Sequence, residues 1–122
     1  MATKAEGNKR LLKLAGMLEK MDAKKYAGDV FQEKGKYNAV SLWAKATPER
    51  WGKSKQGWPT LDDIDTPFDS VMKEFGMTGQ EVCDFYDAEE NPEATAKSTA
   101  AWIRKFVAGR QKKAAKKKSV KK

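Results

Sequence analysis

The sequence predicts an all-α protein: a single compact domain of about five short helices with a long tryptophan-containing loop, followed by a lysine-rich C-terminal tail. Apolar residues recur at helical spacing in several stretches, and no stretch alternates as a half-buried strand would. Helix-capping residues stand in front of most of these stretches. A chain of 122 residues, of which 39% are hydrophobic, is long enough to bury one core.

The first helix is predicted close to the N-terminus. Thr3 and Glu6 have the spacing of a capping box, in which each side chain satisfies a backbone N–H at the start of a helix. Gly16 lowers the stability of this helix by about 1 kcal/mol relative to alanine and leaves room for another element to pack closely. The apolar stripe of the helix comprises Leu11, Leu14, Ala15, Leu18 and Met21.

The next part of the chain carries weaker signals. Residues 22–35 are compatible with a short helix and with an irregular turn. Asn38 can cap a short helix that contains Trp43. Residues 47–60 hold two prolines and two glycines, so we expect a long loop there.

Two helices joined by a tight turn are predicted next. Thr66 followed by Pro67 is typical of a helix start, because proline fits the first helical position. Gly76 predicts the end of this helix, since glycine adopts the left-handed conformation that closes many helices. Thr78 and Glu81 form another capping box and predict a second helix directly afterwards.

The stretch 70–86 resembles the helix-turn-helix family, with apolar residues on both sides of a turn glycine. It departs from that family at Met72, where alanine is usual, and in its charge. The would-be recognition helix carries Glu81, Asp84 and Asp87 and no basic residue, and carboxylates would be repelled by the phosphates that flank a DNA groove. We therefore interpret this stretch as two packed helices without a DNA-reading role.

The last helix is predicted to open at Asn91–Pro92 and to end at Gly109. We expect Trp102, Ile103 and Phe106 to belong to the core, on the same helical face as Thr95 and Thr99.

The net charge of the chain is confined to the segment 109–122. It carries Arg110 and seven lysines without an acid, which leaves 17 basic against 17 acidic residues in the rest of the chain. The sequence thus predicts a helical domain over 1–108 and a basic, flexible tail over 109–122, with Gly109 as a hinge. Alanines 114 and 115 would allow the tail to become helical when phosphates relieve the lysine repulsion. The lysines are Lys112, Lys113, Lys116, Lys117, Lys118, Lys121 and Lys122.

Composition excludes several chemistries. The chain has no histidine and a single cysteine, so it lacks the usual general base and any Cys/His zinc site. Four aspartates cluster between positions 62 and 69, but Phe68 stands where a calcium loop requires glycine. We expect no enzymatic activity, no cofactor and no metal.

Two observations predict a cytoplasmic protein that does not enter a membrane. The chain has a single cysteine, Cys83, which we interpret as packed, and it has no apolar stretch long enough to span a bilayer.

Tryptophans and basic residues alternate between positions 43 and 58, and this pattern has three interpretations. Indole faces beside lysines suit unpaired bases and their phosphates. The indoles of Trp51 and Trp58 could instead pin the loop onto the body, or could form a contact with a partner protein. The candidate contacts are Trp51, Lys53, Lys55 and Trp58.

Charge is also divided unequally within the body. Residues 1–55 hold 13 basic and 6 acidic side chains, a net charge of +7, whereas residues 56–108 hold 4 basic and 11 acidic side chains, a net charge of −7. Either the two halves attract each other during folding, or the body has a bipolar surface with a basic face.

The order of the segments RLLKLAGMLEKM, NAVSLWAKA and FGMTGQEVCDFYDAEENPEATAKSTAAWIRKFV resembles small all-helical proteins of unknown function from bacteriophages and mobile elements. This resemblance implies an accessory protein and no particular activity. Combined with the tail, the sequence predicts an accessory protein that binds DNA or RNA non-specifically through its lysines. The alternative is a phage-type modulator that binds a host protein through its helical body.

Overall fold

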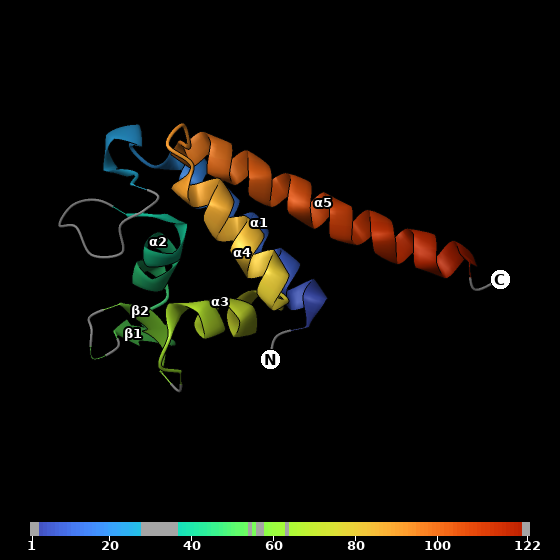
Figure 1. The fold of residues 1–122 in the computed structure, drawn as a ribbon, viewed down its shortest axis with the longest axis horizontal. Helices are drawn as coiled ribbons and strands as arrows, with labels where there is room; N and C mark the ends of the chain where they lie inside the picture. Colours follow the sequence, from blue (N-terminus) through green and yellow to red (C-terminus); the bar gives the residue numbers. More distant parts are fainter. Residues whose placement is uncertain (1–2, 28–36, 54, 56–57, 63, 121–122) are drawn as a thin grey trace.

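The computed structural model describes residues 3–27, 37–53, 55, 58–62 and 64–120, with side chains as far as Lys112. These residues form five α-helices, a 3₁₀ turn and a two-stranded sheet (Figure 1). In chain order the elements are α1 (Lys4–Lys20), η1 (Ala23–Lys25), α2 (Ala39–Ala46), β1 (Trp51–Lys53), β2 (Pro59–Leu61), α3 (Pro67–Phe75), α4 (Gly79–Glu90) and α5 (Ala96–Val120). The mostly helical fold is confirmed, but the fold is not purely all-α.

The predicted loop over 47–60 is wrong in one respect, because it contains an antiparallel hairpin. Trp51 pairs with Leu61 and Lys53 pairs with Pro59. Two strands of three residues are not stable alone, so this hairpin depends on its contacts with the helices. The Leu61 N–H donates to the hydroxyl of Ser70 on α3 at 2.9 Å, which anchors β2.

Local capping signals correctly located the starts of four helices. Each cap side chain accepts a hydrogen bond from the backbone N–H three residues ahead, which satisfies a group that the helix leaves unpaired. Gly76 closes α3 in the left-handed conformation, with φ 60° and ψ 39°, as predicted for the glycine turn. The four capping residues are Thr3, Asn38, Thr66 and Thr78.

Helix α1 packs against both α5 and α3. The expectation that Gly16 permits a close approach is wrong, because open space surrounds the position that its Cβ would occupy. The close approach lies at Gly7, where an added Cβ would overlap the backbone carbonyl of Phe75 at the end of α3. Four of the five predicted residues of the stripe, Leu11, Leu14, Ala15 and Leu18, are buried, together with Gly7. Met21, the fifth, follows the last residue of α1 and is only partly buried.

Both predicted boundaries of the last helix are wrong. Helix α5 begins at Ala96, where Thr95 and Ser98 exchange backbone and hydroxyl hydrogen bonds, and Asn91 instead lies at the end of α4. It continues through Gly109 to Val120, so Gly109 does not end the helix. A helix of 25 residues extends well past the other elements toward the C-terminus (Figure 1).

Core predictions for α5 hold in part. Ile103 is fully buried, whereas Trp102 and Phe106 are half-buried and pack at the edge of the core. Their rings stack on one another with centroids 5.2 Å apart. Cys83 is exposed on α4, contrary to the expectation that it is packed, because it lies on the helix face opposite Phe85.

The ambiguous stretch 22–35 is only partly described. Ala23–Lys25 form the 3₁₀ turn η1, which Asp22 caps by accepting from the Lys24 N–H at 3.0 Å. Tyr26 and Tyr37 then form an isolated parallel bridge. Residues 28–36, on which the remainder of that prediction falls, lie outside the described residues.

Candidate functional site

The basic end of α5, residues 111–120, continues the helix beyond the body (Figure 1). Gln111 and Lys112, the first residues of this segment, are exposed. Lysines 113, 116, 117 and 118 belong to the helix, and Lys121 and Lys122 lie outside the described residues. The segment is therefore a helical continuation of the body over most of its length.

Arg110 differs from the lysines that follow it, because its side chain turns inward and is 9% exposed. Its guanidinium donates to the backbone carbonyls of Phe75 at 3.2 Å and of Gly76 at 2.7 Å. It also donates to Asn8 Oδ1 at 3.0 Å and forms an ion pair with Glu81 at 3.3 Å. The sequence grouped Arg110 with the exposed tail, whereas the structure uses it to hold the α3–α4 turn and α1 together.

The acid that pairs with Arg110 is also the N3 residue of the capping box of α4. Burial alone would raise the pKa of the Glu81 carboxyl, but the hydrogen bond from the Thr78 N–H and the charge of Arg110 hold it below the usual value. Glu81 is thus ionised at neutral pH, and it ties the start of α4 to the base of the basic end of α5.

The structure separates the tryptophan and lysine candidates of the hairpin. Trp51 on β1 is 4% exposed and donates from its indole to Glu74, so it pins the hairpin in place. Trp58 is 44% exposed, and Lys53 and Lys55 are exposed as well. Only Trp58 and the two lysines are therefore accessible to a partner.

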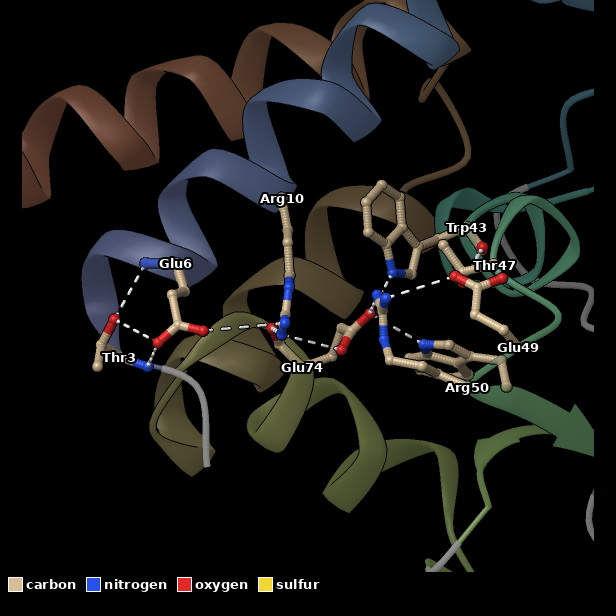
Figure 2. Close-up of polar contacts among 9 residues, drawn as sticks. Thr3, Glu6, Arg10, Trp43, Thr47, Glu49, Arg50 and Glu74 are labelled. Atoms are coloured by element: carbon tan, nitrogen blue, oxygen red, sulfur yellow. Dashed lines mark hydrogen bonds and ion pairs between the residues drawn. The ribbon is translucent and has the colours of Figure 1, made fainter.

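Glu74 on α3 is a buried acid, 2% exposed, on which three elements converge (Figure 2). Arg10 of α1 forms an ion pair with its Oε1 at 3.1 Å, and Arg50 forms one with its Oε2. The indole N–H groups of Trp43 and Trp51 donate to Oε2 at 2.7 Å and 3.1 Å. This cluster joins α1, α2 and the hairpin to α3.

The chemistry of this cluster is structural. Burial alone would raise the pKa of Glu74, but the hydrogen bonds from Arg50, Trp43 and Trp51 outweigh burial and hold the pKa below the usual range. Both carboxylate oxygens accept hydrogen bonds from these side chains, which come from three different parts of the chain. Both arginines come from the basic half of the sequence and Glu74 from the acidic half, which supports attraction between the two halves within the fold.

Sequence reasoning missed the Glu74 cluster, although one signal was present. Position 74 lies in the buried stripe of α3, next to Phe75 and three residues after Val71. An acid on a buried helix face indicates paired cationic or N–H groups, because an unpaired charge there is strongly destabilising. Its partners could not be identified from sequence, since Arg10 lies 64 positions away.

A second buried acid, Glu89 of α4, is 1% exposed and lies at the start of α2. Its Oε1 accepts the Ala39 N–H at 2.8 Å, whereas Oε2 is buried with no hydrogen-bond partner. Burial raises the pKa of Glu89 to about 8, although the N–H groups of Ala39 and Val40 act in the opposite direction. This carboxyl is therefore largely protonated at neutral pH. Its hydrogen bond with the Ala39 N–H connects α4 to the start of α2.

Within the described parts of the chain, no group of three or more cysteine, aspartate or glutamate side chains is arranged to hold a metal ion. Over the same residues, none of the helices has the length and apolar character needed to cross a bilayer. No family model, curated protein or solved structure matches this chain. The fold defines a small, mostly helical protein whose last helix extends beyond the body and carries a cluster of lysines there.

Proposed function

We propose that this protein is a non-enzymatic accessory protein that binds nucleic acid without sequence specificity through the lysines of α5 and of the residues that follow it. The observation that carries this proposal is the concentration of seven lysines and no acid within residues 111–122. Five of these lysines belong to the part of α5 that extends beyond the body. Arg110 is not included, because its guanidinium is committed to the body. The proposed contacts are Lys112, Lys113, Lys116, Lys117, Lys118, Lys121 and Lys122.

The chemistry of lysine accounts for the absence of sequence specificity. An ammonium group is a point charge that meets phosphate oxygens through Coulomb attraction and the release of counterions. Phosphate contacts position a protein on nucleic acid but carry no base information. The exposed surface of α4, with Asp84 and Asp87, would be repelled by the same phosphates, which orients the body away from them.

The salt dependence of binding tests this proposal. If about six lysines meet duplex phosphates, the logarithm of the association constant falls with the logarithm of salt concentration at a slope near −5. Duplexes of unrelated sequence should bind alike. Deletion of residues 112–122, which retains Arg110, should abolish binding and leave the melting temperature unchanged. Equal binding by the deleted protein would refute the proposal.

Two variants of equal charge sharpen the test. One replaces Lys112, Lys113, Lys116 and Lys117 by alanine; the other replaces four exposed lysines of α1. The first should weaken binding by at least about tenfold and reduce the salt slope by about 3 to 4. The second should change both quantities far less. Equal losses in the two variants would place the binding surface on the body. The control lysines are Lys4, Lys9, Lys13 and Lys20.

A protein contact through the hairpin is the second candidate function, as expected for a phage-type modulator of a host protein. It is favoured by Trp58, the most exposed large apolar side chain among the described residues, which lies beside exposed Lys53 and Lys55. Partially exposed tryptophan is typical of the centre of a protein interface. In this case Trp58→Ala should release a captured protein from cell extract after nuclease treatment, whereas deletion of residues 112–122 should retain it.

A further inference from the structure

We infer that the basic end of α5 binds as a preformed, anchored helix and therefore prefers duplex DNA to a single strand. This inference rests on the proposed function and specifies the form of the nucleic acid. It depends on three properties of the described residues: α5 is continuous, Arg110 contacts the body, and the aromatic rings that precede the basic segment stack on one another.

The anchor lies one residue before the exposed segment. The guanidinium of Arg110 is bonded to two backbone carbonyls of the α3–α4 turn and to Asn8 of α1. It also lies 4.5 Å from the centroid of the Phe106 ring, one turn back on the same helix. These contacts with α1 and the α3–α4 turn hold α5 against the body at Arg110, and we infer that they set the direction in which the basic end leaves it.

The dimensions of the extension suit a duplex. From Arg110 to Val120 the helix rises about 15 Å at about 1.5 Å per residue, and an α-helix with its side chains is about 10–12 Å across. The major groove of B-form DNA is about 12 Å wide and admits one helix between its two rows of phosphates. A helix that is already formed meets both rows without further ordering, which lowers the entropic cost of binding.

The aromatic rings argue against binding of single strands. Single-strand binding proteins obtain about 1–3 kcal/mol from each base that stacks on an aromatic ring. Residues 111–122 contain no aromatic side chain. The aromatic residues that precede this segment in the sequence, Trp102 and Phe106, stack on each other, and Trp102 also stacks on Phe85 at 5.6 Å. Because these rings already stack on other rings of the protein, an unpaired base would obtain little stacking energy at this end of the molecule.

A duplex of RNA provides a further contrast. The major groove of A-form RNA is deep and too narrow for side chains to read, so a helix cannot lie in it. The order of affinity at equal length and equal salt should therefore be duplex DNA first, with duplex RNA and single-stranded DNA below it. Charge alone would instead favour both duplexes equally.

The experiment compares the full chain with the double variant Ala114→Gly/Ala115→Gly. Each replacement lies beyond the body, keeps every charge, and together they weaken the helix about 20-fold in its equilibrium constant. Fluorescence anisotropy is measured with a labelled 20-base-pair DNA duplex, the matching RNA duplex and the single DNA strand. Ser119→Gly/Val120→Gly, at the end of the helix, is the matched control.

We expect the native protein to bind duplex DNA at least about tenfold more tightly than the single strand, and the alanine-to-glycine variant to lose most of that preference. The variant should bind the single strand within about twofold of the native protein, and the control should retain the preference. Salt-dependent binding with equal affinity for all three probes would overturn this inference and leave the proposed function intact. Failure of all three probes to bind would instead refute the proposed function itself.

Discussion

Arg110 donates a hydrogen bond of 2.7 Å from its guanidinium to the carbonyl oxygen of Gly76, a residue 34 positions earlier in the chain. Gly76 is the left-handed residue that ends α3, so its carbonyl lies where a helix leaves backbone acceptors unpaired. The last arginine before the lysines thus completes the turn between two helices of the body. The boundary between body and basic segment lies after Arg110, not before it.

Arg110→Ala should destabilise the body by about 2–4 kcal/mol, because buried carbonyls of the turn lose a charged donor and Glu81 loses its partner. Lys112→Ala, two residues later and exposed, should change the free energy of unfolding by less than about 0.5 kcal/mol. Urea denaturation followed by circular dichroism measures both. Equal stability of the two variants would show that the guanidinium contacts contribute little.

Two glycines of α1 should respond to alanine in opposite directions. At Gly7 a Cβ would overlap the carbonyl of Phe75, so Gly7→Ala should force α1 away from α3 and destabilise the protein by about 1–3 kcal/mol. At Gly16 the same atom meets open space, so Gly16→Ala should stabilise the helix by about 0.5–1 kcal/mol. Thermal melting of both variants checks the prediction, and a stabilising Gly7→Ala would contradict the close packing at that position.

The two tryptophans of the hairpin should differ in stability. Trp51→Phe removes an indole donor from buried Glu74 and should lower the free energy of unfolding by about 1–3 kcal/mol. Trp58→Phe preserves most of the apolar area of a half-exposed side chain and should cost less than about 1 kcal/mol. Chemical denaturation distinguishes them. If Trp58→Phe were the more destabilising, Trp58 rather than Trp51 would hold the hairpin.

Glu89 should make the protein less stable as the pH rises. Its pKa is about 8 in the folded protein against an ordinary value of 4.5, because burial disfavours the charged form. Below about pH 4.5 the carboxyl is protonated in both the folded and the unfolded chain, and the folded protein keeps its full stability with respect to this group. This stability is lost as the pH rises through about 8, at up to about 1.4 kcal/mol per pH unit, because only the unfolded chain releases the proton.

Glu89→Gln should remove this slope, since the amide stays neutral at every pH and its oxygen can still accept the Ala39 N–H. Glu93→Gln, at an exposed position near the end of α4, is the control and should retain the slope. Urea denaturation from pH 5 to pH 9 measures all three proteins. An unchanged slope in Glu89→Gln would assign the pH dependence to another group.

Sequence alone determined the features that depend on neighbours three or four positions apart. Thr3, Asn38, Thr66 and Thr78 each cap a helix through a group three residues ahead, and the positive φ of Gly76 depends on that residue's lack of a Cβ. The charge of the segment 109–122 is likewise a property of composition, which needs no fold to be visible.

Only the tertiary structure decided the features whose partners lie far away in the chain. The hairpin exists because Trp51 reaches Glu74 and Leu61 reaches Ser70, and its three-residue strands carry too weak a local signal to be predicted. Helix α5 passes through Gly109, where the next residue, Arg110, is held by contacts with α1, α3 and α4; these contacts outweigh the intrinsic cost of a glycine of about 1 kcal/mol. Distant contacts of this kind stabilise a local conformation that the residues themselves do not favour.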